Sequence, residues 1–162
     1  MKEPQKESGP GTQFDRVCWL CFGLGLLFAL QGLSWVLLGA FDPFGFYETL
    51  LARSLFGVES LSPEARRVFA FALIPFGATD CAYFLLFTWV VHEPVRRMDF
   101  RASRALLVSL LVWFAIDSGA CLLHEVYFNI LIVNLPCLVL LLPALSYLHL
   151  RARTHRAGQV TE

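Results

Sequence analysis

Charged residues are scarce in this sequence, and the motifs of common enzyme classes are missing. Only 16% of its 162 residues are charged, the formal net charge is zero, and neither an HExxH nor a GxGxxG pattern occurs. A zinc-ligand spacing, a phosphate-binding loop and a nucleophile paired with a base are also absent. The sequence therefore names no cofactor, favours binding over catalysis, and gives no sign of a nucleic-acid partner.

What the sequence has is apolar length. Hydrophobic residues make up 57% of the chain and the mean hydropathy is +0.60, which is too apolar for a soluble domain of this size. A helix needs about 20 apolar residues to cross a bilayer. Four runs qualify, at residues 17–41, 68–91, 105–123 and 126–150. We predict an all-α fold, an integral membrane four-helix bundle at residues 17–150, flanked by a polar tail (1–16) and a basic tail (151–162).

The first run is expected to be a retained helix, because it is longer than the hydrophobic part of a signal peptide and no small-residue cleavage site precedes Asp42. Basic residues then set the topology. Ten of them lie before the first run, between the second and third, and after the fourth: Lys2, Lys6, Arg16, Arg96, Arg97, Arg101, Arg104, Arg151, Arg153 and Arg156. The positive-inside rule predicts a multi-pass protein of the plasma (inner) membrane with both termini cytoplasmic. The same basic clusters would meet anionic lipid headgroups.

The outer connection between the first two runs is long enough to hold a short helix. Asp42 and Pro43 are suited to begin it, and Gly57 to end it. Its apolar face would hold Phe44, Tyr47, Leu51 and Leu55. We predict a helix lying in the outer membrane interface, the alternative being an aromatic loop. Ser62 and Asp99 are expected to cap the second and third membrane helices.

A stripe of small residues marks the first run. Gly25, Gly32 and Gly39 recur every seven residues, with Ala29 between the first two. Small residues allow helices to approach closely in lipid, so this face should pack against another helix. The partner could be a helix of the same chain or a second copy in a homo-oligomer. Gln31 lies beside the stripe and should form a hydrogen bond across helices.

Two acidic residues, Asp80 and Asp117, interrupt the second and third runs, and neither run contains a lysine or arginine. Ionisable residues at bilayer depth usually face a bundle interior or a wet cavity and mark a functional site. Both lie near the middle of their predicted helices, so we expect them to face each other. Other polar or aromatic residues would complete the layer: Gln31, Thr79, Tyr83, Trp113, Ser118, Cys121, His124 and Asn134.

An unpaired buried charge is costly, which leaves the two carboxyl groups three states. Both are protonated and hydrogen-bonded, or they share a proton, or a cation supplies the missing charge. A metal ion, if one binds, would use Asp80 and Asp117. Our hypothesis is a site for a cation or a small amphiphilic, lipid-like ligand that enters from the outer side. The alternative is a non-catalytic accessory or scaffold subunit whose polar residues only hold helices together.

A second alternative is redox catalysis, because Cys18 and Cys21 form a CxxC pair such as membrane thiol–quinone oxidoreductases use. The pair would lie at the cytoplasmic end of its helix, where thiols stay reduced.

The first helix is Gly-rich, the outer segment is led by proline, residues 116–119 read IDSG, and an asparagine-containing turn precedes a leucine-rich last helix. This layout resembles that of DoxX-like bacterial inner-membrane proteins. The resemblance lies mostly in hydropathy and implies a four-helix membrane bundle. Named members are linked to a respiratory sulfur-oxidising complex, and no residue here carries that chemistry over.

Overall fold

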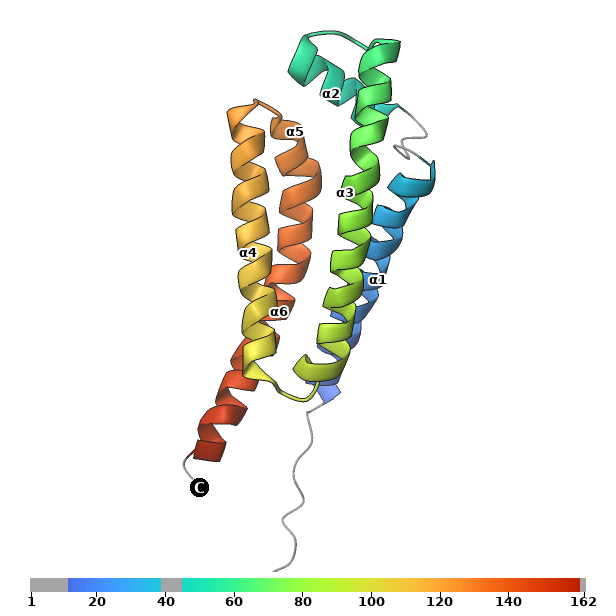
Figure 1. Ribbon diagram of the computed structural model, residues 1–162. Coiled ribbons are helices and arrows are strands. Elements are labelled where there is room, and N and C mark those ends of the chain that lie inside the picture. Colours follow the sequence, from blue (N-terminus) through green and yellow to red (C-terminus); the bar gives the residue numbers. More distant parts are fainter. Residues whose placement is uncertain (1–11, 39–44, 161–162) are drawn as a thin grey trace, which may run out of the picture.

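The computed structural model describes residues 12–38 and 45–160, and these ranges contain helices and turns but no strand (Figure 1). One long helix is followed by a short π-helical segment, and another is preceded by one. In chain order the elements are α1 (Thr12–Leu38), α2 (Phe46–Phe56), α3 (Pro63–Val90), η1 (Val91–Val95), α4 (Phe100–Leu123), α5 (Tyr127–Asn129), η2 (Ile130–Asn134) and α6 (Leu135–Val160).

In the described part of the chain, four helices are long and apolar enough to cross a membrane: Gln13–Leu38, Pro63–Val95, Phe100–Leu123 and Tyr127–Gly158. They indicate a multi-pass membrane protein with an all-α fold. The helices extend beyond the predicted runs, since α1 begins at Thr12 and α6 continues to Val160. Most of the segment that was expected to be a basic tail is therefore the last part of α6.

Local signals in the sequence set several helix ends. The Ser62 hydroxyl accepts a hydrogen bond from the Ala65 amide at 3.2 Å, and the Asp99 carboxylate accepts one from the Arg101 amide at 2.7 Å. Gly57 ends α2 in the left-handed region, at φ 66°. A helix is thus present in the connection between α1 and α3, although it begins at Phe46, and its place in the outer membrane interface stays a prediction. Asp42 and Pro43, expected to begin it, lie outside the described residues.

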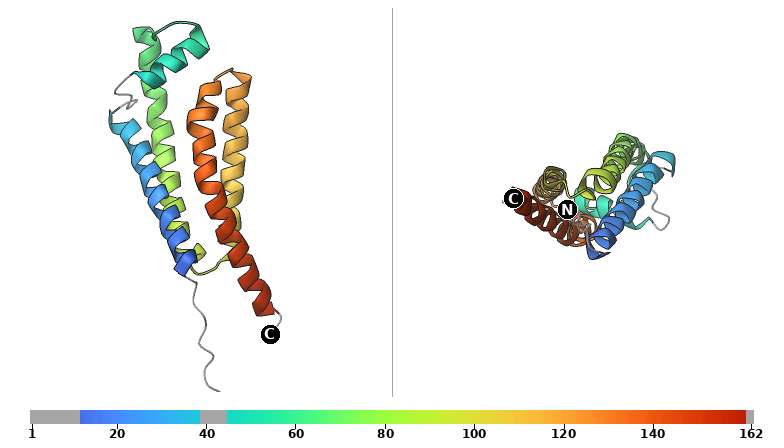
Figure 2. Two further views of the ribbon diagram at one scale, coloured as in Figure 1. Left: turned by 180° about the vertical axis from the view of Figure 1, so that it is seen from behind. Right: turned by 90° about the horizontal axis from the view of Figure 1, so that it is seen from below.

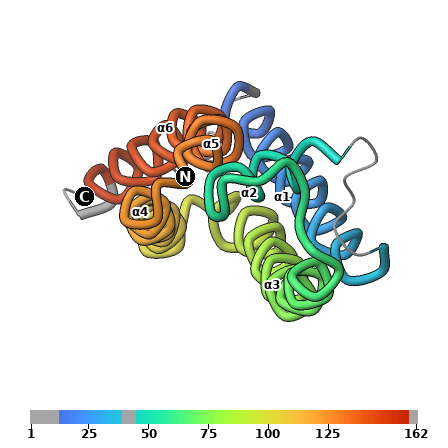
Figure 3. Tube along the Cα trace, turned by 90° about the horizontal axis from the view of Figure 1, so that it is seen from above, coloured from blue at the N-terminus to red at the C-terminus, as the bar shows by residue number. Residues whose placement is uncertain are grey.

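The helices form two antiparallel pairs, α1 with α3 and α4 with α6 (Figures 1 and 2). The pairs meet through α1 and α6 and through η1, and the most deeply buried side chains gather toward the η1 end. That core includes Phe14, Cys21, Val91, Val95 and Leu148, each 0% exposed. At the opposite end α2 lies across the space between the two pairs (Figure 3).

The small-residue stripe of α1 packs within the chain. A Cβ atom built on Gly32 would lie 2.7 Å from the Gly77 carbonyl oxygen and 2.7 Å from the Cys81 amide nitrogen, both in α3. Gly25 faces Thr88 and Phe87 of the same helix, and Ala29 is buried. Of the two partners that the sequence left open for the stripe, a helix of the same chain therefore occupies the face at Gly25 and Gly32, and a homo-oligomer stays a prediction. Gly39 lies outside the described residues.

Candidate ligand-binding cavity

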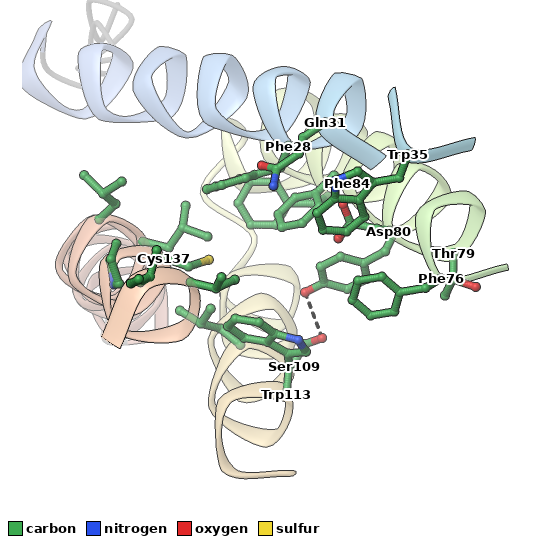
Figure 4. A pocket seen from close by; sticks show the side chains of 18 residues that line it. Phe28, Gln31, Trp35, Phe76, Thr79, Asp80, Phe84, Ser109, Trp113 and Cys137 are labelled. Carbon is green, nitrogen blue, oxygen red and sulfur yellow. Dashed lines mark hydrogen bonds between the residues drawn. The ribbon is translucent and has the colours of Figure 1, made fainter. Parts of the chain in front are cut away.

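A cavity of about 430 Å³ lies between the two helix pairs, with walls from α1, α3, α4, η2 and α6 (Figure 4). Its volume is in the range of sites for small organic ligands, about 300–1,000 Å³. The wall is mainly aromatic and aliphatic, and the aromatic side chains are Phe28, Trp35, Phe76, Tyr83, Phe84, Phe87 and Trp113. Five lining residues have a hydroxyl, amide or carboxyl group in the side chain: Gln31, Thr79, Asp80, Tyr83 and Ser109.

Asp80 is the one carboxyl group among the described lining residues, and no lysine or arginine lines the cavity with it. It lies near the middle of the Pro63–Val95 span. Its half-buried side chain forms no hydrogen bond or ion pair with any described residue. On the opposing helix is Gly32, where a Cβ would lie 2.9 Å from Asp80 Oδ2. The carboxyl group thus lies against the backbone of α1 at Gly32, where there is no side chain to bond to. Its capacity to accept hydrogen bonds remains available to a ligand in the cavity.

The other polar groups of the cavity are arranged differently. The Tyr83 hydroxyl and the Ser109 hydroxyl are 3.0 Å apart and join α3 to α4 across the cavity. The Thr79 hydroxyl donates to the Pro75 carbonyl of its own helix at 2.8 Å. The Gln31 amide lines the cavity without a hydrogen bond to the described residues, so the cross-helix bond expected for it is not formed. Gln31 and Asp80 are therefore the polar side chains open to a ligand.

Asp117 belongs to a different group of side chains, which we call the Asp117 cluster: Asp117, Ser118, Cys121, Asn129 and Asn134. Asp117 Oδ2 accepts hydrogen bonds from Asn134 Nδ2 at 2.6 Å, from Asn129 Nδ2 at 3.3 Å and from the Cys121 thiol at 3.8 Å. Asn134 Nδ2 also donates to the Ser118 hydroxyl at 3.1 Å, and Asn134 is 0% exposed. The cluster joins α4 to α5 and η2, and none of its members lines the cavity.

The predicted polar layer therefore divides in two. Gln31, Thr79, Asp80, Tyr83 and Trp113 line the cavity, and the Asp117 cluster holds the remaining predicted residues except His124. His124 is exposed where α4 ends and joins neither group. The two carboxyl groups do not share partners as a facing pair would. Trp113 faces the cavity, and Asp117 follows it by four residues in α4. Four residues turn a helix about 40° beyond one full turn, so the Asp117 side chain points further toward η2.

Sequence reasoning missed Tyr47 of α2 as a member of this region. Its hydroxyl donates to Asn129 Oδ1 at 3.1 Å, and its ring centroid lies 5.3 Å from that of Phe128 and 6.3 Å from that of Phe69. Tyr47 thus contacts both helix pairs from above. Burial raises the pKa of Tyr47 to about 12, so the hydroxyl stays protonated and able to donate. The only sequence signal was its place on the predicted apolar face of that helix.

The cysteine pair lies in the core at the η1 end. Cys18 is 3% exposed and Cys21 is 0% exposed, and neither forms a disulfide. A thiol that reacts with quinone or with another thiol needs access, which these positions do not provide. Within residues 12–38 and 45–160 no three His, Cys, Asp or Glu side chains come together as a metal site would require.

No family model matches the sequence, and no curated protein or solved structure matches it either. The function has to be inferred from the chain's own residues. Among the described residues, the feature with chemical potential is the Asp80 carboxyl group, which has no hydrogen-bond or ion-pair partner there and lines a cavity together with aromatic side chains. Aromatic faces and a carboxylate both attract cations.

Proposed function

We propose that this multi-pass membrane protein binds a small amphiphilic organic cation in the cavity, with Asp80 as the charged contact. The observation that carries the proposal is the Asp80 carboxyl group, which faces the cavity without a hydrogen-bond or ion-pair partner among the described residues. A buried charge without a partner is costly, so a positively charged ligand would supply what the protein does not.

The rest of the wall suits the organic part of such a ligand. Cation–π contacts contribute about 0.5–2 kcal/mol each, and aromatic cages are a common means of binding ammonium groups. Trp35 and Phe84 lie close to Asp80 from α1 and α3, and Trp113 faces them from α4 (Figure 4). Asp80 would supply the charge, and Tyr83 and Trp113 the orientation. The apolar surface would hold the hydrocarbon part.

The proposed setting is a plasma (inner) membrane with both termini cytoplasmic, so that α2 lies at the outer interface. In that orientation α2 covers the outer end of the space between the helix pairs (Figure 3). A ligand that arrives from the outer side would pass α2, which Tyr47 fastens to Asn129.

Binding of benzyltrimethylammonium to the full chain in phosphatidylcholine nanodiscs tests this function. This cation has one aromatic ring and a permanent charge, and neopentylbenzene is its uncharged carbon isostere. Asp80→Asn should raise the Kd for the cation about tenfold to a hundredfold, because a hydrogen-bonded or paired charge contributes about 1.5–3 kcal/mol. The isostere should bind wild type and variant equally.

The matched control is Asp117→Asn, which also replaces an intramembrane carboxylate by an amide but lies outside the cavity. It should leave the Kd unchanged. The fluorescence of Trp35 and Trp113 reports binding in the cavity, because these two residues line it whereas Trp19 and Trp89 do not. Equal affinity of wild type and Asp80→Asn for the cation, or no binding by the wild type, would refute the proposal.

An accessory scaffold is the second candidate, and the Asp117 cluster favours it. Hydrogen bonds of the cluster and of Tyr47 connect α2, α4, α5 and η2. Polar contacts of this kind hold membrane helices together. A chain that only scaffolds would bind neither probe in the Trp35 and Trp113 fluorescence assay and would gain no thermal stability from benzyltrimethylammonium.

A further inference from the structure

Among the described residues that line the cavity there is one carboxyl group and no lysine or arginine. Among the described lining residues, α1, α4 and η2 contribute no titratable side chain, α6 contributes the Cys137 thiol, and α3 contributes Tyr83 besides Asp80. A phenol and a thiol are weaker acids than a carboxylic acid. Asp80 is therefore the group whose charge changes first when protons are added or removed.

The immediate surroundings of Asp80 do little to stabilise its charge. The Tyr83 hydroxyl is engaged with Ser109 at 3.0 Å, and Gly32 opposite carries no side chain. Asp117 differs, because amide groups of Asn129 and Asn134 donate to its carboxylate. A negative charge on Asp80 in the empty cavity would thus lack a cation and, as the described residues are arranged, would accept no hydrogen bond from them. In surroundings of low dielectric constant, that state is disfavoured relative to a neutral carboxyl group.

We propose that the cavity is a proton–cation exchange site, in which an organic cation and a proton compete for the Asp80 carboxylate. This inference rests on the proposed function and adds its coupling to pH. The neutral carboxyl group of the empty site loses its proton to water, and the cation then pairs with the carboxylate. The reverse step returns the proton and releases the cation. The site has zero net charge before and after, so neither end state leaves an uncompensated charge among the aromatic side chains.

The exchange predicts a defined pH dependence. Benzyltrimethylammonium has no titratable group, so any effect of pH on its affinity comes from the protein. As pH falls into the range where Asp80 is protonated, the Kd should rise by about tenfold per pH unit, and at alkaline pH it should become constant. On the acidic limb each bound cation should release close to one proton, measured by calorimetry in two buffers with different ionisation enthalpies.

Three variants separate the source of the effect. Asp80→Asn should bind weakly at every pH and release no proton. Asp80→Glu, which keeps the carboxyl group, should retain proton release even if its affinity is lower, and it covers the case in which Asp80→Asn folds poorly. Asp117→Asn should keep the wild-type pH dependence.

The outcomes distinguish this inference from the proposed function. Wild-type binding that depends on Asp80 but is independent of pH and releases no proton would overturn the exchange and leave the binding site in place. Loss of the pH dependence in Asp117→Asn would also overturn it, because the proton would then belong to the other carboxyl group. Absence of binding, or binding that is indifferent to Asp80→Asn, would overturn the proposed function itself.

Discussion

Replacing Gly32 with alanine probes the contact that brings α1 against α3 beside the cavity. The added Cβ would lie 2.7 Å from two backbone atoms of α3, in Gly77 and Cys81, and 2.9 Å from Asp80 Oδ2. Backbone cannot turn aside as a side chain can, so the helices must move apart. Overpacking usually costs about 1–3 kcal/mol, and alanine recovers about 0.5–1 kcal/mol as the better helix former. We expect a net loss of about 1–2 kcal/mol in the free energy of unfolding.

Gly23→Ala is the matched control in the same helix. No heavy atom lies within 4 Å of a Cβ placed on Gly23, and the residue is exposed. The substitution should therefore keep the gain in helix propensity and be neutral or stabilising by up to about 1 kcal/mol. The two Gly→Ala variants should thus shift stability in opposite directions, with a difference of about 2 kcal/mol.

The assay is unfolding of the full chain in mixed micelles by titration with sodium dodecyl sulfate, followed by circular dichroism. The mass of the protein–detergent particle is measured in parallel. Equal unfolding midpoints for Gly32→Ala and Gly23→Ala would refute the packing argument. If Gly32→Ala instead converted a dimer to monomers without lowering the unfolding midpoint, the glycine face would serve contacts between copies of the chain.

Two further predictions concern the Asp117 cluster. Asn134→Leu removes the shortest hydrogen bond to Asp117 and leaves only the longer bonds from Asn129 and Cys121. Because a hydrogen bond to a charged group contributes about 1.5–3 kcal/mol, the substitution should lower the free energy of unfolding by up to that amount in the same titration, whereas no loss would show that the amide is dispensable. Tyr47→Phe keeps the ring contacts and removes the bond to Asn129, so it should cost about 0.5–1.5 kcal/mol. Because the pKa of Tyr47 is raised to about 12, the contribution of its hydroxyl to stability is complete below pH 10 and is lost as pH rises through about 12. Ultraviolet absorbance of tyrosinate would follow this ionisation. Ionisation of all tyrosines near pH 10 would contradict the prediction.

The features that could be read from the sequence are those decided within a few residues. Ser62 and Asp99 cap their helices because a short polar side chain can reach an amide two or three positions ahead. Gly57 ends α2 because a left-handed backbone is least costly for glycine. The membrane helices follow from composition and length, which do not depend on how the helices pack.

The features that could not be read depend on rotation and on distant partners. The spacing of residues predicts that Asp80 and Asp117 lie near the middle of their helices, but only packing decides toward which neighbour each side chain points. Nothing in the sequence distinguishes Ser109, which meets Tyr83, from other serines of the same helix. Tyr47 and Asn129 are separated by 82 positions in the chain, and their contact follows from the placement of α2 over the helix pairs. The glycine stripe is compatible with either a partner helix or a partner chain.

The unequal supply of hydrogen-bond donors is what separates the two carboxyl groups functionally, and it predicts reciprocal effects of the same substitution. Asp117 receives two amide donors, so Asp117→Asn weakens charge-assisted bonds and should lower the free energy of unfolding by about 1–3 kcal/mol while leaving affinity for benzyltrimethylammonium unchanged. Asp80 receives none from the described residues, so Asp80→Asn should leave stability unchanged or raise it while weakening the affinity. Measuring stability and affinity for both variants tests this directly, because a scaffold would show the first effect without the second. Loss of stability and of affinity together in either variant would mean that the carboxyl groups act as one site after all.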